Sequence, residues 1–291
     1  MASKDEVNMQ IGVAMAFNHV TSAEFMVEAV KLVEAAGFHS VWLPEHVILF
    51  PDYASHYPYS TDGKIPGDPE GVLDPFTALT YVAAHTERIR LGTGICLVPQ
   101  RQPVYTAKAV ADLDYLSGGR VDFGVGIGWL KEEFDNLQMD FRSRAARCIE
   151  YIEVMQALWR PGVSEYRGPT YELQACHFYP KPVQDPHPPI FFGGESDAAL
   201  NRVATHGDGW YGYDLDPARA AAGIAKLEKK LTAVDRSLAD VSIYVGTNRQ
   251  PVTDETVQRY EDVGVAQLIV PLMAGNLDRL QVRMDRLLEF V

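Results

Sequence analysis

Short hydrophobic runs alternate with longer amphipathic stretches along almost the whole chain. The runs are rich in Val and Ile, as buried strands are, and the stretches repeat hydrophobic residues every three or four positions, as helices with one buried face do. Eight β-then-α steps can be followed in this way. The predicted strands cover residues 10–16, 40–43, 89–95, 121–127, 190–192, 209–213, 241–246 and 267–272.

Residues that begin and end helices support this division. Thr21 or Ser22 can cap the first helix and Gly37 can end it, while Pro103 opens another helix that stops at the Gly118-Gly119 pair. The remaining helices are predicted at residues 75–86, 144–159, 197–206, 217–234, 254–263 and 277–289.

Strands that alternate with helices in this way form a parallel sheet with right-handed crossovers. An open doubly wound sheet is the alternative architecture. Eight repeats without a second zone of composition favour a (β/α)₈ barrel in which residues 1–291 form one domain. Two insertions, residues 44–74 after the second strand and 161–189 after the fourth, are predicted to cover the barrel mouth, and the second contains a hairpin around Gly168-Pro169.

Composition excludes several classes of function and site. A net charge of −13 argues against a nucleic-acid partner, which requires a basic face. Cys96, Cys148 and Cys176 are widely separated, so neither a disulfide framework nor a thiolate metal site is expected. The chain has no long apolar run and no signal-peptide pattern, so we expect no membrane association and a cytoplasmic location.

Candidate chemistry lies where strands end, because barrel ligands bind at the carboxyl ends of the strands. Glu45 and His46 follow the second strand, and such a pair suits proton transfer; the alternative is a polar pair that faces solvent. No metal-binding motif accompanies them.

Three glycine-containing segments follow the later strands. Residues 92–96, which include Gly94, Ile95 and Cys96, and residues 124–129, which include Gly126, Gly128 and Trp129, either let a flat ring lie against the strands or serve barrel closure and core packing. Neither is a dinucleotide fingerprint. The third, residues 193–196, places free N–H groups at a helix start and predicts a phosphate site. It reads Gly193-Gly194-Glu195-Ser196.

Several motifs resemble the bacterial-luciferase-like family over nearly the whole chain. They are Ile89-Arg-Leu-Gly-Thr-Gly94, Leu116-Ser-Gly-Gly-Arg-Val121, Gly124-Val-Gly-Ile-Gly-Trp129, Pro180-Lys-Pro-Val-Gln184 with Pro188-Pro-Ile190, and Gly207-Asp-Gly-Trp210. Leu43-Pro-Glu-His46 and Gly128-Trp-Leu-Lys-Glu-Glu133 resemble the branch of oxidoreductases that depend on coenzyme F420.

The resemblance implies a barrel with the cofactor ring at the strand ends and a cis peptide at Gly94–Ile95. In the resemblance, the acid–histidine pair of the deazaflavin enzymes corresponds to Glu45 and His46. The position of a catalytic Glu that some of them carry is occupied here by Trp129. The phosphate-binding Arg of the flavin monooxygenases falls on Ile127, whereas Glu195-Ser196 matches their phosphate turn.

Three hypotheses follow. The first is an oxidoreductase that transfers a hydride between coenzyme F420 and a small organic substrate. The second is an FMN-dependent monooxygenase that uses reduced flavin and O₂, and the third is a non-catalytic flavin-binding protein. The resemblance allows a homodimer. Aromatic side chains in and near the first insertion predict a partly apolar substrate pocket: Phe17, Phe50, Tyr53, Tyr57 and Tyr59.

Overall fold

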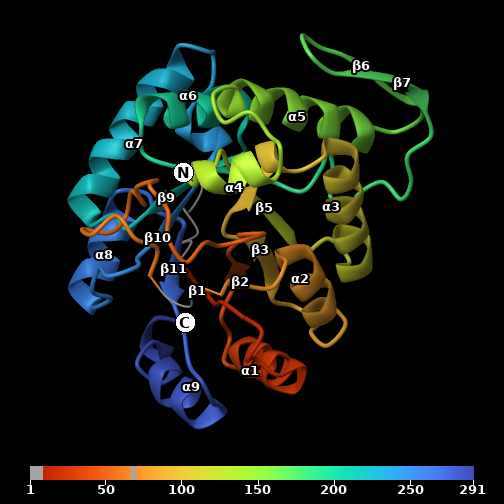
Figure 1. The fold of residues 1–291 in the computed structure, drawn as a ribbon. Helices are drawn as coiled ribbons and strands as arrows, with labels where there is room; N and C mark the ends of the chain where they lie inside the picture. Colours follow the sequence, from red (N-terminus) through yellow and green to blue (C-terminus); the bar gives the residue numbers. More distant parts are fainter. Residues whose placement is uncertain (1–8, 67–69) are drawn as a thin grey trace.

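A closed barrel of parallel strands forms the centre of the computed structural model, which describes residues 9–66 and 70–291 (Figure 1). The two strands that would be the edges of an open sheet, β3 and β5, pair with each other, so the sheet closes. The barrel is therefore confirmed and the open-sheet alternative is wrong. Its strands are β1 (Gln10–Ala14), β2 (Ser40–Leu43), β3 (Arg90–Thr93), β5 (Val121–Gly126), β8 (Ile190–Gly193), β9 (Gly209–Tyr213), β10 (Ser242–Gly246) and β11 (Gln267–Pro271).

Helices surround the barrel, and most begin at a residue whose side chain accepts a hydrogen bond from the first turn. Ser22, Asp74, Ser196, Asp216 and Asn276 all act in this way. The helices are α1 (Ala23–Ala35), α2 (Pro75–Ala83), α3 (Pro103–Ser117), α4 (Lys131–Asn136), α5 (Arg144–Trp159), α6 (Asp197–His206), α7 (Pro217–Thr232), α8 (Asp254–Asp262) and α9 (Leu277–Met284), with 3₁₀ turns at Val98–Gln100, Leu238–Asp240 and Leu288–Phe290.

The structure corrects several predicted boundaries. The predicted strand 89–95 ends at Thr93, and a short strand β4 (Cys96–Leu97) follows the cis peptide bond Gly94–Ile95. Helix α4 was not predicted, and the predicted helix 277–289 ends at Met284.

Both insertions come after the strands where they were predicted. The hairpin in the second one consists of β6 (Ser164–Arg167) and β7 (Glu172–Cys176), which extend beyond α5 in Figure 1. Residues 67–69 of the first insertion, like residues 1–8, lie outside the described part of the chain.

Aromatic side chains fill the barrel interior below its mouth. Trp42 lies 5.2 Å from the ring of Tyr211, and the rings of Phe191 and Tyr244 stack at 4.3 Å. Gly92 makes room for this packing, because a Cβ atom there would lie 2.2 Å from Cδ2 of Trp42. Gly92, in the predicted segment 92–96, therefore serves barrel packing, which is one of the two roles considered for that segment.

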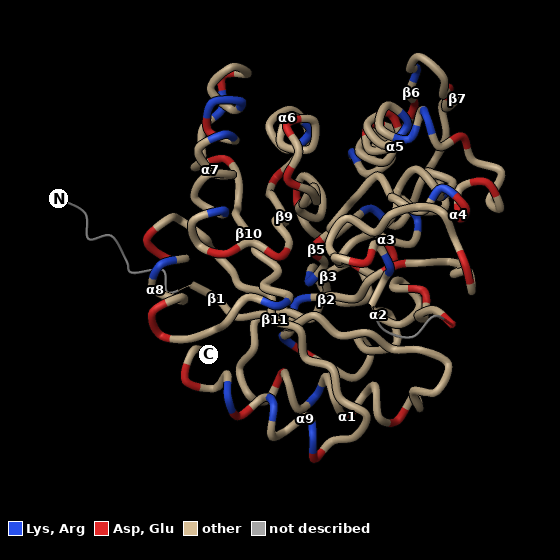
Figure 2. Tube along the Cα trace, turned by 60° about the vertical axis from the view of Figure 1, so that its left-hand side comes forward, with Lys and Arg blue, Asp and Glu red and all other residues tan. Residues whose placement is uncertain are grey.

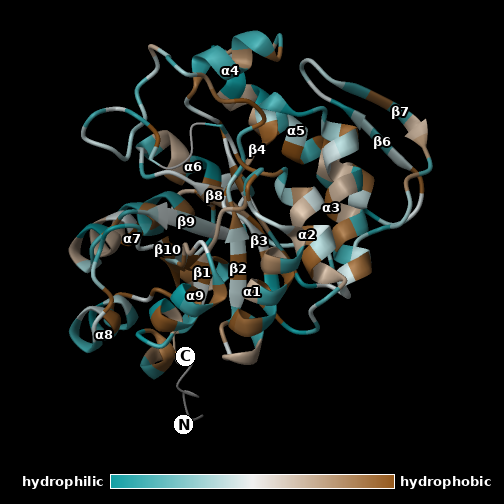
Figure 3. Ribbon diagram, turned by 60° about the horizontal axis from the view of Figure 1, so that its bottom comes forward, coloured by the Kyte–Doolittle hydropathy of each residue, from teal (hydrophilic) through white to brown (hydrophobic). Residues whose placement is uncertain are grey.

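The outer surface carries charges of both signs. Figure 2 shows Lys and Arg interspersed with Asp and Glu along the helices. Hydrophobic and hydrophilic residues alternate along α1, α2 and α3, as expected of helices with one buried side (Figure 3). Among the described residues, no helix combines the length and hydrophobicity that crossing a membrane requires.

Candidate functional site

A cavity of about 430 Å³ lies at the carboxyl ends of the barrel strands, within the size range of small-molecule sites. All of the predicted site residues except Cys96 line it. They are Glu45, His46, Gly94, Ile95, Gly126, Gly128, Trp129, Gly193, Gly194, Glu195 and Ser196. Segments that are up to about half the chain apart thus meet where the strands end.

Strands form the barrel side of the cavity. The expected cis peptide Gly94–Ile95 is present there, and Ile95 projects between two glycines of neighbouring strands. A Cβ atom would lie 2.3 Å from Cδ1 of Ile95 at Gly126 and 2.7 Å from it at Gly193. Those glycines therefore provide space for Ile95 as well as an open wall.

Cys96 points the other way. It is fully buried in the hydrophobic core between barrel and helices, and burial raises the pKa of its thiol well above the ordinary value. The predicted cofactor-binding role of Cys96 is therefore not supported, because its side chain does not line the cavity.

His46 lies at the mouth and is held by a residue that the sequence analysis did not single out. Its Nδ1 atom lies 3.0 Å from Oε2 of Glu133, in the first turn of α4. The Glu133 side chain is completely buried, whereas that of His46 is 10% exposed. Among the described residues, none forms a hydrogen bond with Nε2 of His46, so that atom is available to a ligand.

Glu133 is an anion fixed by several donors. Its Oε1 accepts from the backbone N–H groups of Val47 (2.7 Å) and Ile48 (3.2 Å), and its Oε2 also accepts from Nε2 of Gln100 (3.0 Å). Burial alone would raise the pKa of Glu133, but the hydrogen bonds from His46, Gln100 and Ile48 outweigh it, so the pKa is lowered. An anionic acceptor at Nδ1 requires the proton of neutral His46 to be on Nδ1.

Both carboxylate oxygens of Glu45 already have partners inside the protein. Oε2 accepts from the Leu97 N–H (2.6 Å) and Oε1 from Nε of Arg101 (2.5 Å), which also pairs with Asp74. Glu45 is 4% exposed. Its contacts join the end of β2 to β4, beside the Gly94–Ile95 peptide.

The turn after β8 has the features of an anion site. Ser196 caps α6, and the backbone N–H groups of Gly194 and Ser196 donate no hydrogen bond within the described residues. Glu195 turns away to accept from the Tyr59 hydroxyl (2.9 Å) and the Tyr213 N–H (2.8 Å). Burial raises the pKa of Glu195 despite these donors.

Arg202 adds a cation to the same part of the cavity. It lies on α6 and lines the cavity, and its Nε is buried without a hydrogen-bond partner among the described residues. Burial lowers the pKa of Arg202, although the nearby Cys148 acts in the opposite direction. An unpaired guanidinium nitrogen costs free energy unless a ligand accepts from it. Sequence reasoning missed Arg202 because a charged residue on a surface helix is ordinarily assigned to solvent.

Two of the aromatic residues predicted for the pocket, Tyr57 and Tyr59, line the cavity, together with the unpredicted Tyr211 and Tyr213. Tyr53 stands behind them, in edge contact with Trp129 at 5.6 Å. Phe17 belongs to the hydrophobic core, and Phe50 is not among the lining residues.

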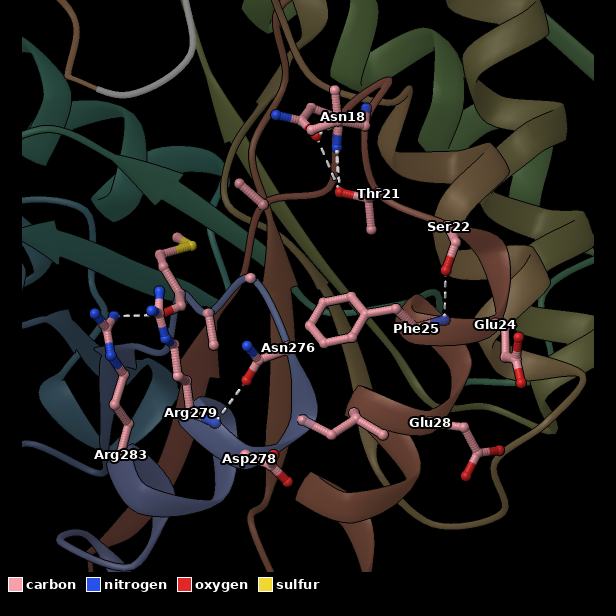
Figure 4. A pocket seen from close by; sticks show the side chains of 16 residues that line it. Asn18, Thr21, Ser22, Glu24, Phe25, Glu28, Asn276, Asp278, Arg279 and Arg283 are labelled. Atoms are coloured by element: carbon pink, nitrogen blue, oxygen red, sulfur yellow. Dashed lines mark hydrogen bonds between the residues drawn. The ribbon is translucent and has the colours of Figure 1, made fainter.

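A second cavity of about 810 Å³ lies outside the barrel, between α1 and α9 (Figure 4). The polar side chains at its ends are already used within the protein: Ser22 and Asn276 cap the two helices, and Thr21 bonds Asn18. Carboxylates and arginines are mixed along its wall. We therefore place the functional site at the barrel mouth. No group of side chains suited to a metal ion occurs among the residues that the structure describes.

Comparison with known proteins agrees with this architecture. Residues 9–287 match the family of luciferase-like monooxygenases. The chain belongs to this family. An uncharacterized protein of Mycobacterium tuberculosis is 30% identical over 265 residues, which are 89% of this chain and 91% of that protein.

Solved structures show the same fold at lower identity. The coenzyme F420-dependent tetrahydromethanopterin reductase from Methanopyrus kandleri superposes with a TM-score of 0.73 at 17% identity and covers 98% of both chains. The monooxygenase RslO1 from Streptomyces bottropensis superposes with a TM-score of 0.68 at 21% identity and covers 97% of this chain and 89% of its own. A reductase and a monooxygenase thus share the fold of this chain.

Proposed function

We propose that the chain is an oxidoreductase that transfers a hydride between a coenzyme F420-type deazaflavin and a small organic substrate. The observation that carries the proposal is the buried Glu133 carboxylate behind His46, which leaves Nε2 of the imidazole facing the cavity. The similarity to an F420-dependent reductase supports it.

The cavity residues fit such a cofactor. Gly94, Ile95 and the neighbouring glycines offer a smooth wall for a flat ring. Gly194, Ser196 and Arg202 offer N–H donors and a positive charge for a phosphate. When bound, the deazaflavin would itself be the hydride acceptor or donor.

His46 handles the proton that accompanies the hydride. When an alcohol is oxidised, the hydride leaves its carbon and the hydroxyl proton passes to Nε2 of His46; in the reverse direction Nε2 returns a proton to the carbonyl oxygen. Glu133 stabilises the imidazolium that forms, because it presents a negative charge to Nδ1. In our proposal Glu45 is a positioning residue and transfers no proton itself. Its oxygens accept hydrogen bonds from Leu97 and Arg101 and hold both residues beside the cavity wall.

The second candidate is an FMN-dependent monooxygenase. Arg202 favours this function. The flavin monooxygenases have a phosphate-binding Arg at the position of Ile127, and Arg202 brings a cation to the cavity from another position. The similarity to the monooxygenase RslO1 points the same way.

Cofactor titration separates the two functions. F420 and FMN are titrated into the chain at matched ionic strength, and turnover is followed with each reduced cofactor while O₂ is monitored. We expect tighter binding of F420, turnover without O₂ consumption, and at least a hundredfold loss of rate in His46→Ala. His85→Ala, in the exposed turn that follows α2, is the control. Tighter FMN binding with substrate-dependent O₂ consumption establishes the monooxygenase instead.

A further inference from the structure

We propose that the loop side of this cavity binds an uncharged substrate with a flat aromatic or alicyclic ring, whose hydroxyl or carbonyl oxygen meets His46. The inference rests on the proposed function, since it assigns a substrate class to the same site. It is drawn from five side chains that we call the aromatic arc: His46, Trp129, Tyr57, Tyr59 and Tyr213.

Rings of the arc touch one another in sequence across the cavity. Trp129 lies 5.8 Å from His46 and 5.1 Å from Tyr57, and Tyr59 lies 5.6 Å from Tyr57 and 4.8 Å from Tyr213. All four contacts are edge-to-face, which is a favourable geometry for aromatic pairs. The arc is therefore one packed surface that runs from the end of β2 to the end of β9.

Each member of the arc lines the cavity and is only partly buried, so its remaining exposed surface faces a ligand. Trp129, Tyr57 and Tyr59 lie in the loops that follow the barrel strands, whereas Gly94 and Ile95 belong to the barrel wall. A substrate between them can thus lie against rings on one side while the proposed cofactor uses the other wall.

Hydroxyl groups on the arc are already used within the protein. The Tyr59 hydroxyl donates to Glu195 at 2.9 Å, and that of Tyr57 interacts with the Tyr213 hydroxyl. Burial raises the pKa of both Tyr57 and Tyr59, so these phenols stay neutral. The arc consequently presents mainly apolar ring surface, with His46 as the polar group at its end.

Charges around the arc disfavour an ionic substrate. Of the described residues that line the cavity, Arg202 is the only Lys or Arg, and it lies on α6, which contributes no member of the arc. An anion on the arc would meet the Glu195 carboxyl group, while Arg249, which donates to the Tyr59 carbonyl at 3.2 Å, is already paired with Asp214. A cation would find the oxygens of Glu195 already bonded and Asp214 already paired with Arg249 at 3.1 Å.

A set of three probes with the same ring tests this inference. 2-Acetylnaphthalene, 2-naphthoate and 2-naphthylmethylammonium are titrated into the full-length chain by calorimetry, with excess inorganic phosphate present to occupy the Arg202 side. The titrations are repeated with Trp129→Ala and with the control Tyr105→Ala, whose side chain is exposed on α3. Circular dichroism checks that each variant is folded.

We expect the neutral ketone to bind at least tenfold more tightly than either ion, a difference of about 1.4 kcal/mol. Trp129→Ala should weaken the ketone at least tenfold and Tyr105→Ala should leave it unchanged. Equal or tighter binding of the naphthoate or the ammonium probe overturns the inference, as does unchanged ketone binding in Trp129→Ala. Because no redox cofactor takes part, failure here is distinguishable from failure to bind F420 or FMN.

Discussion

The Nδ1 atom of His46 and the Oε2 atom of Glu133 lie 3.0 Å apart although 87 residues separate them along the chain. His46 follows β2 and Glu133 lies in the first turn of α4, so the contact exists only because the barrel brings the ends of β2 and β5 together. The pair gives the imidazole one ring orientation and one tautomer. This makes Glu133 a positioning residue with a measurable effect on its partner.

We expect Glu133→Gln to lower the turnover rate by about a hundredfold, the lower end of the contribution of general acid–base catalysis. The uncharged amide no longer stabilises an imidazolium and no longer requires the imidazole proton to be on Nδ1. Nitrogen-15 NMR of the His46 imidazole reports its tautomer without any need for turnover.

Glu132→Gln is the matched control, since Glu132 lies on the same turn of α4 but accepts from the Ala54 and Ser55 N–H groups instead. If the nitrogen-15 shifts of His46 report the same tautomer in wild type and Glu133→Gln, the positioning role is refuted.

Arg202→Ala should weaken cofactor binding about tenfold or more, because one charge-assisted hydrogen bond to a phosphate contributes about 1.5–3 kcal/mol. It should not lower the free energy of unfolding, since the guanidinium Nε has no hydrogen-bond partner in the described structure. Cofactor titration and urea unfolding measure the two effects. Arg279→Ala, in the cavity between α1 and α9, should bind cofactor as wild type does; equal affinities for both variants would contradict the assignment.

Glu195 predicts an unusual pH dependence of stability. Its pKa is raised above the ordinary 4.5, so the folded state retains a proton that the unfolded chain releases. The contribution of Glu195 to the free energy of unfolding is therefore largest below pH 4.5, and it falls as the pH rises from there through the raised pKa of the folded state.

In Glu195→Gln this pH-dependent part is absent. The difference in unfolding free energy between wild type and Glu195→Gln, measured in urea at several values from about pH 4.5 to pH 8, should shift in favour of the variant as the pH rises. A pH-independent difference would show that the carboxyl is ordinary.

Gly92→Ala should destabilise the barrel by about 1–3 kcal/mol or more, since the added methyl group would overlap the Trp42 indole ring in a filled interior. Gly275→Ala is a suitable control, because nothing lies within 4 Å of a Cβ atom placed there. Urea unfolding compares the two variants. Equal stability would mean that the barrel interior repacks freely around Trp42.

The barrel could be predicted because hydrophobic periodicity records which side of each element is buried. The position of His46 followed from the same pattern, since a residue directly after a barrel strand must lie near the mouth. Glu133 could not be found in this way. Glu132 and Glu133 are adjacent carboxylates, and only the course of the chain through Gly128, with φ +77°, decides which of them turns inward.

Cys96 shows a different limit. Adjacent residues at the end of the strand face opposite sides, so a segment that brings Ile95 to the cavity sends Cys96 into the core. Treating Gly94, Ile95 and Cys96 as one cofactor wall ignored that alternation. Arg202 escaped notice for the converse reason, because a charged residue on a helix is ordinarily assigned to solvent.

The placement of Trp129 also gives the molecule an internal optical reporter. Of the four tryptophans in the sequence, Trp42, Trp159 and Trp210 are at most 2% exposed, and Trp129 alone lines the cavity at the barrel mouth. Water that a ligand displaces from the mouth changes the solvent exposure of this one indole, since the other three are already buried. A change in the intrinsic emission spectrum on ligand addition can therefore be assigned to a single residue, and the Trp129→Phe variant provides the blank.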